Sequence, residues 1–259
     1  MRLTLKYLLR GFGKICAFFV PQKREYFNYQ LPSKIYQKFF IKNIIFLNVG
    51  ADCRAALHLK AHLLRKLSAP LDWIMCYSLN DAYLLYKSEF RDFFSVCSED
   101  ISRANDDKRF VITDNGMVAM HHFPLGVEIR AYLPNFKCVM QNRFQRLKAE
   151  IVKSKCVVFV AHRAENIELL KDFALKMQEL INLWCEKCAI NGRKKHIFLV
   201  NILHKENTQG FERQIYKVSD NAEIIQFVFD DSSTNQNHWL GNKKLWGKVM
   251  SEIEVLGKS

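Results

Sequence analysis

Four short apolar runs, separated by longer helical patterns, constrain the fold of this chain most strongly. Each run is seven or eight residues long and rich in Val, Ile, Leu and Phe; the runs cover residues 43–49, 156–162, 196–202 and 222–229. Runs of this length are typical of strands buried on both faces. Helical patterns lie between and after them, at 53–67, 78–95, 137–153, 165–188 and 245–256. This alternation predicts an α/β fold with a central mixed, largely parallel sheet flanked by helices.

The remaining segments fit one domain with an N-terminal appendage. The stretch "RFVITDNGMVAMHHF" (109–123) predicts two strands joined by a turn at Asp114-Asn115-Gly116, because Asn-Gly tolerates positive φ. No internal repeat or long linker interrupts the chain. We therefore expect a basic amphipathic appendage at 1–40 and a single α/β domain at 41–259.

The appendage begins with a pattern that suits a membrane surface. Arg2, Lys6, Arg10 and Lys14 recur every fourth residue and so share one stripe of a helix, while Leu, Tyr, Phe and Ile cover the remainder. Such a helix can lie on an anionic membrane through residues 1–22. The alternative is a helix docked on the domain with its Lys and Arg facing water. The apolar run is too short and too charged to span a bilayer, and no signal-peptide cleavage site follows it.

The charge balance restricts the partners of the chain only broadly. There are 39 Lys and Arg against 26 Asp and Glu, a formal charge of +13 that favours anionic partners such as lipid surfaces, acidic glycans or nucleic acid. No nucleic-acid-binding motif accompanies this charge, so a nucleic acid partner is not expected.

The eight cysteines predict a reduced, cytoplasmic protein. Most of them lie in apolar periodic runs, where a thiol packs as a small hydrophobic group, and disulfide frameworks belong to short secreted chains. The location could also be peripheral, at the inner face of the membrane, if residues 1–22 bind lipid. Cys185 and Cys188 form a CxxC inside a helical pattern, without a second ligand pair, so we expect no metal site and no cofactor.

Cys53 differs from the other cysteines in its setting. It follows a strand and a Gly-containing turn and begins a helix, with Asp52 placed to accept a backbone N–H of the first helical turn. The positive end of a helix dipole favours the thiolate, which is the nucleophilic form. The alternative for an isolated cysteine in this position is a buried structural thiol.

A nucleophilic thiol needs a base and a group that orients the base. His121 and His122 end a strand just before Pro124, and only one of them can face Cys53 because consecutive strand residues point to opposite sides. Asn201 and Asp72 are the candidates for the orienting group. Each could instead be structural, with Asn201 capping a turn and Asp72 bonded to backbone amides beneath Trp73.

Several motifs occur in the order found in a known family. They are "FLNVGADCRAALHLK…APLDW", "NGMVAMHHFP", "NRFQRLKAEIVKSKCVVFVAHR" and "HIFLVNILHKE". Together they resemble, over about residues 43–207, a bacterial family of uncharacterised domains described as papain-like cysteine peptidases. A papain-like fold would be α+β, which is the alternative to the α/β prediction. Leu71 stands where the family tends to have Phe.

The resemblance also implies roles for individual residues. Cys53 corresponds to the nucleophile and His121 to the base, since the second position of the His pair varies in the family. Arg143 and Arg146 correspond to its basic helix, and His162 or Arg163 to its basic residue after a strand, so these four are substrate-binding candidates. The family pattern defines no third catalytic residue.

Three functional hypotheses follow. The first is a cysteine-dependent hydrolase or acyl transferase acting on a peptide, acyl or glycan substrate. The second is an enzyme that modifies surface polysaccharide and binds a phosphate or acidic sugar through Arg143, Arg146 and Arg163. The segment "GKICAFFVPQKREY" supports that context, because it is similar to stretches in bacterial enzymes that build surface polysaccharides. The third is a non-catalytic module that binds a membrane surface.

Overall fold

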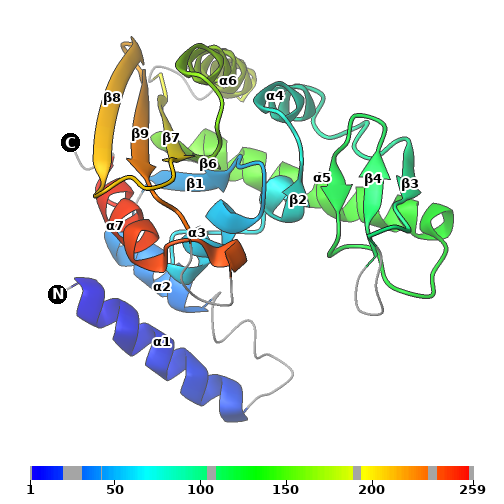
Figure 1. Ribbon diagram of the computed structural model, residues 1–259, viewed down its shortest axis with the longest axis horizontal. Helices are drawn as coiled ribbons and strands as arrows, with labels where there is room; N and C mark the ends of the chain where they lie inside the picture. The colour runs from blue at the N-terminus through cyan, green and yellow to red at the C-terminus, as the bar shows by residue number, and fades with distance from the viewer. Residues whose placement is uncertain are drawn as a thin grey trace.

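A five-stranded sheet forms the centre of the molecule (Figure 1). The computed structural model describes residues 2–19, 31–41, 43–103, 109–188, 194–232 and 238–256. The strands are β1 (Ile44–Asn48), β6 (Cys156–His162), β7 (His196–His204), β8 (Glu212–Ser219) and β9 (Ala222–Phe229). Their order is β1-β6-β7-β9-β8, and only β8 runs antiparallel to its neighbour. The predicted α/β fold with a mixed, largely parallel sheet is therefore confirmed. The alternative prediction, an α+β fold, does not describe the main sheet.

Helices cover both faces of this sheet because successive strand residues point to opposite sides. On one face Phe159 and its neighbours pack against α4 (Leu79–Lys87), α5 (Ile129–Lys153) and α6 (Ile167–Lys187). On the other face Val158 and its neighbours pack against α3 (Arg54–Ala61) and α7 (Lys243–Ile253). Two shorter helical turns are η3 (Pro70–Trp73) and η4 (His238–Leu240). The apolar runs are thus buried on both sides, as their composition indicates.

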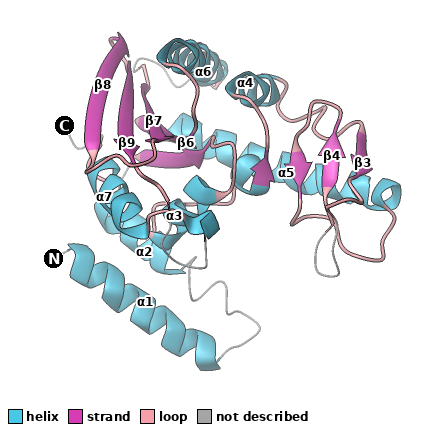
Figure 2. Ribbon diagram, in the orientation of Figure 1, coloured by secondary structure: helices cyan, strands magenta, loops and turns pink. Residues whose placement is uncertain are grey.

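A second, smaller sheet lies beside α5 and contains the predicted hairpin (Figure 2). Its strands are β2 (Ile74–Met75), β3 (Cys97–Glu99), β4 (Val111–Thr113) and β5 (Val118–Ala119), in the order β2-β5-β4-β3 and all antiparallel. The turn between β4 and β5 has Gly116 at a φ of 84°, the left-handed conformation that the Asn-Gly pair predicts.

The N-terminal segment forms two helices that pack against each other, α1 (Arg2–Phe19) and α2 (Leu31–Phe40). Lys6 of α1 is buried, and its ammonium donates to the Glu254 carboxylate just beyond α7; Tyr36 of α2 donates to the same carboxylate. One cation of the basic stripe, Lys6, thus faces the protein, whereas the expectation for a docked helix was that its Lys and Arg would face water; Lys14 of the same stripe is exposed. None of the helices in the described parts of the chain is both long and apolar enough to cross a membrane.

Candidate functional site

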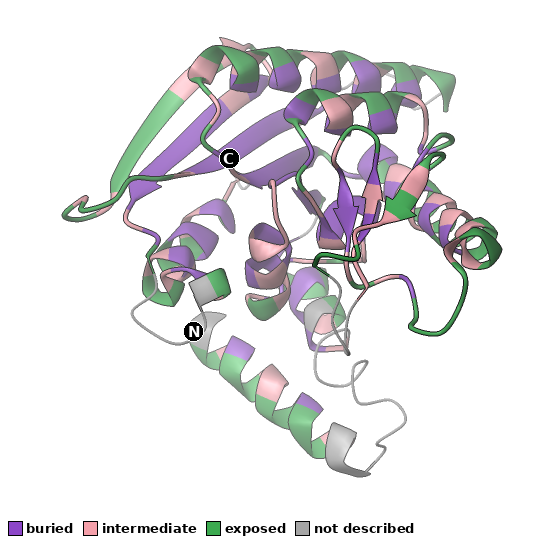
Figure 3. Ribbon diagram, turned by 45° about the vertical axis from the view of Figure 1, so that its right-hand side comes forward, coloured by how far each residue is buried: buried purple, intermediate pink, exposed green. Residues whose placement is uncertain are grey.

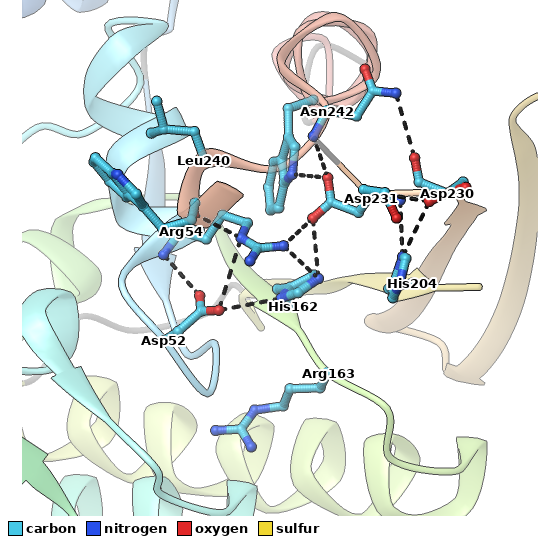
Figure 4. A network of polar contacts seen from close by, with 12 residues as sticks. Asp52, Arg54, His162, Arg163, His204, Asp230, Asp231, Leu240 and Asn242 are labelled. Carbon is cyan, nitrogen blue, oxygen red and sulfur yellow. Dashed lines mark hydrogen bonds and ion pairs between the residues drawn. The ribbon is translucent and has the colours of Figure 1, made fainter. Parts of the chain in front are cut away.

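A cluster of charged side chains lies where the parallel strands of the main sheet end (Figure 4). Asp52 and Arg54 come from the segment after β1, His162 is the last residue of β6, and Asp231 follows β9. The carboxyl ends of parallel strands are where open α/β sheets bind their ligands. The position of this cluster therefore makes it the first candidate for a functional site.

The turn after β1 is held tightly against the end of β6. The Asn48 side chain accepts a hydrogen bond from the Gly50 N–H at 3.0 Å and donates one to the Leu71 carbonyl at 3.1 Å. A Cβ atom on Gly50 would lie 3.1 Å from Asn48 Oδ1 and 3.3 Å from the His162 backbone nitrogen. Glycine is required here by this close approach, which keeps the turn and His162 in contact.

Cys53 is the N-cap residue of α3, one position later than the cap that the sequence suggested at Asp52. It is half-buried, and its carbonyl accepts the Leu57 N–H at 3.0 Å, a bond of the first helical turn. Asp52 Oδ1 accepts the Arg54 N–H at 2.8 Å, so this carboxylate satisfies one of the free donors at the helix start. The thiol is thus placed beside the positive end of the helix dipole.

His162 contacts two carboxylates, one through each ring nitrogen. Its Nδ1 lies 3.5 Å from Asp52 Oδ2, and its Nε2 lies 3.3 Å from Asp231 Oδ2. Burial raises the pKa of Asp52, but the hydrogen bonds from His162 and Arg54 outweigh it and hold this pKa below its ordinary value. The imidazole is therefore fixed next to the turn that carries Cys53.

Asp231 is the most buried member of the cluster and joins it to α7. Its Oδ1 accepts hydrogen bonds from the Asn242 N–H at 2.7 Å and the Trp246 indole N–H at 2.9 Å. Its Oδ2 pairs with Arg54, which also lies 3.4 Å from His162 Nε2. A buried carboxylate that accepts this many hydrogen bonds fixes the groups around it.

Arg163, predicted to bind substrate, is used inside the protein. It is 5% exposed, and its guanidinium donates to the Val49 carbonyl at 2.8 Å, the Tyr77 carbonyl at 2.7 Å and Glu165 at 2.6 Å. Figure 4 shows this side chain pointing away from the charged cluster. Arg163 thereby ties the segments that follow β1 and β2 to the end of β6.

Asn201 and Asp72, the two candidates for the orienting group, are both buried among protein partners. Asn201 lies within β7, and its side-chain amide donates to the Arg163 carbonyl at 3.2 Å. Asp72 lies in η3, where it accepts the Ala69 N–H at 2.9 Å and pairs with Arg65 at 3.0 Å. Burial raises the pKa of Asp72, although Arg65 opposes this. These partners tie both side chains to the protein interior and not to the His162 ring.

His121 and His122 lie just beyond β5. The His121 side chain is exposed, and its ring meets the Trp73 ring edge-on at 5.9 Å. His122 is half-buried against Phe136, with 5.4 Å between ring centroids. Burial lowers the pKa of His122 to about 4, and the charges of Arg143 and His121 act in the same direction.

The other two arginines proposed to bind substrate lie on α5. Arg143 is half-buried, and its positive charge lowers the pKa of both His122 and Asp72, which places it beside the η3 and β5 segments. Arg146 is exposed, and its Nε–H donates to the Asn142 carbonyl of the preceding turn at 3.3 Å. The structure thus places Arg143 near His122 and Asp72, and it places His162 next to the turn that carries Cys53.

Three other cysteines have surroundings that differ from those of Cys53. Cys156 and Cys185 are buried in the apolar cores, and burial raises the pKa of both thiols, for Cys156 to about 12. Cys188, at the end of α6, is exposed. Within the residues that the structure describes, no group of three or more His, Cys, Asp or Glu side chains is arranged to hold a metal ion.

The sequence did not predict two members of the charged cluster, Arg54 and Asp231, as site residues. A signal for Asp231 was present, because "FVFDD" places two carboxylates directly after a buried strand. The partners of Asp231 come from positions far away in the chain, so the pattern alone does not show what the carboxylate contacts.

A model of the family described as "putative papain-like cysteine peptidase (DUF1796)" matches residues 44–207, which is well over half of the chain. The matched segment runs from the first residue of β1 to just beyond β7, so it contains Cys53 and His162 and leaves Asp231 outside. No curated protein and no solved structure matches the chain.

Proposed function

Because the chain belongs to this family of putative papain-like cysteine peptidases, we propose that it is a cysteine-dependent hydrolase with Cys53 as its nucleophile. The observation that carries the proposal is the position of Cys53 at the start of α3, next to a turn held against His162. A helix start supplies both a positive potential for the thiolate and free backbone N–H groups for an oxyanion.

In this proposal His162 is the general base and Asp231 is the group that orients it. The Nε2 of His162 faces the buried Asp231 carboxylate, whereas its Nδ1 faces the turn at Asp52 that leads to Cys53. A base needs one ring nitrogen fixed by a partner, and Asp231 supplies that partner. The other nitrogen, Nδ1, lies 3.5 Å from the carboxylate of Asp52, the residue that precedes Cys53. His121, the base that the family resemblance implies, is the second candidate; its ring meets the Trp73 ring edge-on at 5.9 Å.

The reaction proceeds in two acyl-transfer steps. His162 takes the thiol proton, and the Cys53 thiolate attacks the substrate carbonyl to form a tetrahedral oxyanion near the first N–H groups of α3. The carbon–leaving group bond breaks, the leaving group receives the proton from His162, and a thioester remains on Cys53. Water, deprotonated by His162, then releases the acid and regenerates the thiol. An acyl transferase differs only in the acceptor of the second step.

Site-resolved alkylation tests the nucleophile without knowledge of the substrate. Iodoacetamide reacts with thiolates, so the rate at each cysteine, followed by peptide mass spectrometry between pH 5 and 9, reports its thiolate fraction. Exposed Cys138 on α5 is the internal reference. We expect Cys53 to react about tenfold faster than Cys138 at pH 6.5. Equal rates at the two sites would overturn the proposal.

Two matched histidine variants then identify the base. We expect His162→Asn to slow alkylation of Cys53 at pH 6.5 and leave Cys138 unchanged, while His121→Asn changes neither rate. The reverse result would assign the base to His121. With p-nitrophenyl acetate as a small activated ester, Cys53→Ala should abolish the acylation burst and His162→Asn should reduce it. A burst that persists in Cys53→Ala excludes Cys53 as the acylated residue.

A further inference from the structure

The outer side of α1 carries an apolar face that no described part of the protein covers. Tyr7, Leu8, Phe12 and Ile15 are 63%, 65%, 55% and 60% exposed. The spacing of these residues places them on one side of an α-helix over two turns. Figure 3 shows exposed residues along the side of α1 that points away from the rest of the molecule. Exposed apolar side chains gathered in this way mark an interaction surface.

The opposite side of the same helix faces the protein, and it carries Lys6 together with Leu9, which packs against the apolar core. The Lys6 ammonium bonds to Glu254 and lies 4.8 Å from the centroid of the Tyr36 ring. The charges of Lys6 and Arg10 add to the effect of burial in lowering the pKa of His62, so Arg10 also lies on the inner side. An amphipathic helix at a protein surface ordinarily does the reverse and buries its apolar side.

We propose that α1 lies in the surface of an anionic lipid bilayer, with Tyr7, Leu8, Phe12 and Ile15 inserted among the lipid chains. An amphipathic helix in such an interface buries its apolar side by roughly 5–10 Å, and aromatic side chains are favoured there. The ion pair with Glu254 fixes the helix so that its apolar side points outward, ready to meet the bilayer.

Charge selects an anionic membrane over a second copy of the chain as the occupant of this face. Lys14 is exposed, and its helical position lies next to that of Tyr7. On the neighbouring α2, Lys34 and Lys38 are exposed, as is the ring of Phe39 at 64%. The whole chain has a formal charge of +13, so two copies repel each other, whereas an anionic lipid surface attracts the chain.

Vesicle flotation of the full chain tests this proposal. We expect binding to vesicles of 70% phosphatidylcholine and 30% phosphatidylglycerol, weaker binding at high salt, and little binding to pure phosphatidylcholine. The double variant Phe12→Glu with Ile15→Glu should weaken binding to the anionic vesicles at least tenfold. The matched control is Leu169→Glu with Leu183→Glu on α6, where both leucines are also 51% exposed and the charge change is the same.

The outcomes separate the possible occupants of the face. Retained binding in the α6 control and lost binding in the α1 variant support the bilayer. Equal loss in both variants would mean that only net charge matters, and it would overturn the proposal. Failure of the wild-type chain to bind anionic vesicles would also overturn it, as would a dimer in analytical ultracentrifugation that Phe12→Glu with Ile15→Glu dissociates. Unchanged circular dichroism of both variants establishes that they fold.

Discussion

Gly241 is a single residue on which the geometry of the charged cluster depends. It adopts a φ of 60°, and a Cβ atom there would overlap the Asp231 carboxylate. The carboxylate has no room to retreat, because Asn242 and Trp246 hold one oxygen while His162 and Arg54 hold the other. Glycine at this position therefore serves two purposes, a left-handed backbone and close packing on a buried charge.

We predict that Gly241→Ala lowers the free energy of unfolding by about 3 kcal/mol, the sum of left-handed strain and overpacking. The matched control is Gly126→Ala, since Gly126 has a φ of 76° and no described atom lies within 4 Å of the place that a Cβ would take. Strain alone predicts a loss of about 1 kcal/mol in the control. Urea denaturation of the two variants measures the difference, and equal losses would show that contact with Asp231 costs nothing.

At the scale of the residue, the sequence singles out Cys53 and His162, the latter as a substrate-binding candidate, because each lies next to a strong local pattern. Cys53 follows an apolar strand and begins a helix, and His162 ends another apolar strand. Asp231 also follows a strand, but its role depends on His162, Trp246 and Asn242, which tertiary packing brings to it. No local sequence pattern predicts such a contact. The sequence therefore indicates Asn201 and Asp72, and not Asp231, as candidates for the group that orients the base.

At the scale of the element, Arg163 joins three segments. Its guanidinium holds the carbonyl that follows β1, the carbonyl of Tyr77 after β2, and Glu165 after β6. The face of the Tyr77 ring lies 5.0 Å from the guanidinium carbon. Only a planar group with several donors can make these contacts at once. The turn that carries Cys53 follows Val49 directly, so its position depends on this arginine.

We predict that Arg163→Lys lowers the free energy of unfolding by about 2 kcal/mol, because a single ammonium leaves buried carbonyls without a donor. Arg146→Lys on the exposed side of α5 is the matched control and should change stability by less than about 0.5 kcal/mol. Chemical denaturation measures both, and iodoacetamide labelling of the Arg163→Lys variant reports whether the Cys53 turn loosens. Similar stability of the two variants would contradict the conclusion that Arg163 holds the three segments together.

The elements that sequence did not predict lack a strong apolar pattern. Strand β8 is mostly exposed, and among the described strands it pairs with β9 alone, so its sequence "ERQIYKVS" carries no apolar run. Helix α3 ends at Ala61 and not near Leu67, because Leu63 has a φ of 63° and the Leu64 N–H returns to the Leu59 carbonyl at 2.9 Å. This left-handed helix end normally uses glycine, and with leucine there the sequence carries no stop signal.

At the scale of the whole molecule, three partly or fully buried histidines make stability depend on pH. Burial lowers the pKa of His58 to about 4, of His62 to about 3 and of His122 to about 4. They lie on both sides of the main sheet, with His58 stacked on Trp246 and His122 against Phe136. In the unfolded chain each of them takes up a proton near pH 6.5.

We therefore predict that the protein loses stability as the pH falls from about 6.5 to 4. In that window the unfolded chain binds protons that the folded chain excludes, so acidification stabilises the unfolded state. Each such histidine lowers the free energy of unfolding by up to about 1.4 kcal/mol per pH unit. The raised pKa of Asp72 works in the opposite direction, because the folded carboxyl binds a proton above pH 3.8, and it reduces the slope.

The variant His58→Gln isolates one of these histidines. Glutamine can still donate to the Leu240 carbonyl, which His58 Nε2 contacts at 2.9 Å, but it does not titrate. The free energy of unfolding, measured by urea denaturation at pH 7.0, 5.5 and 4.5, should fall less steeply in this variant than in the wild-type chain. The difference in slope between pH 6 and 4.5 should correspond to roughly one fewer proton bound on unfolding. Leu183→Gln, at an exposed position of α6, should keep the wild-type slope. If both variants showed the same slope, protonation of His58 would not be part of the acid sensitivity, and the stack on Trp246 would have to accept a charged imidazole in the folded protein.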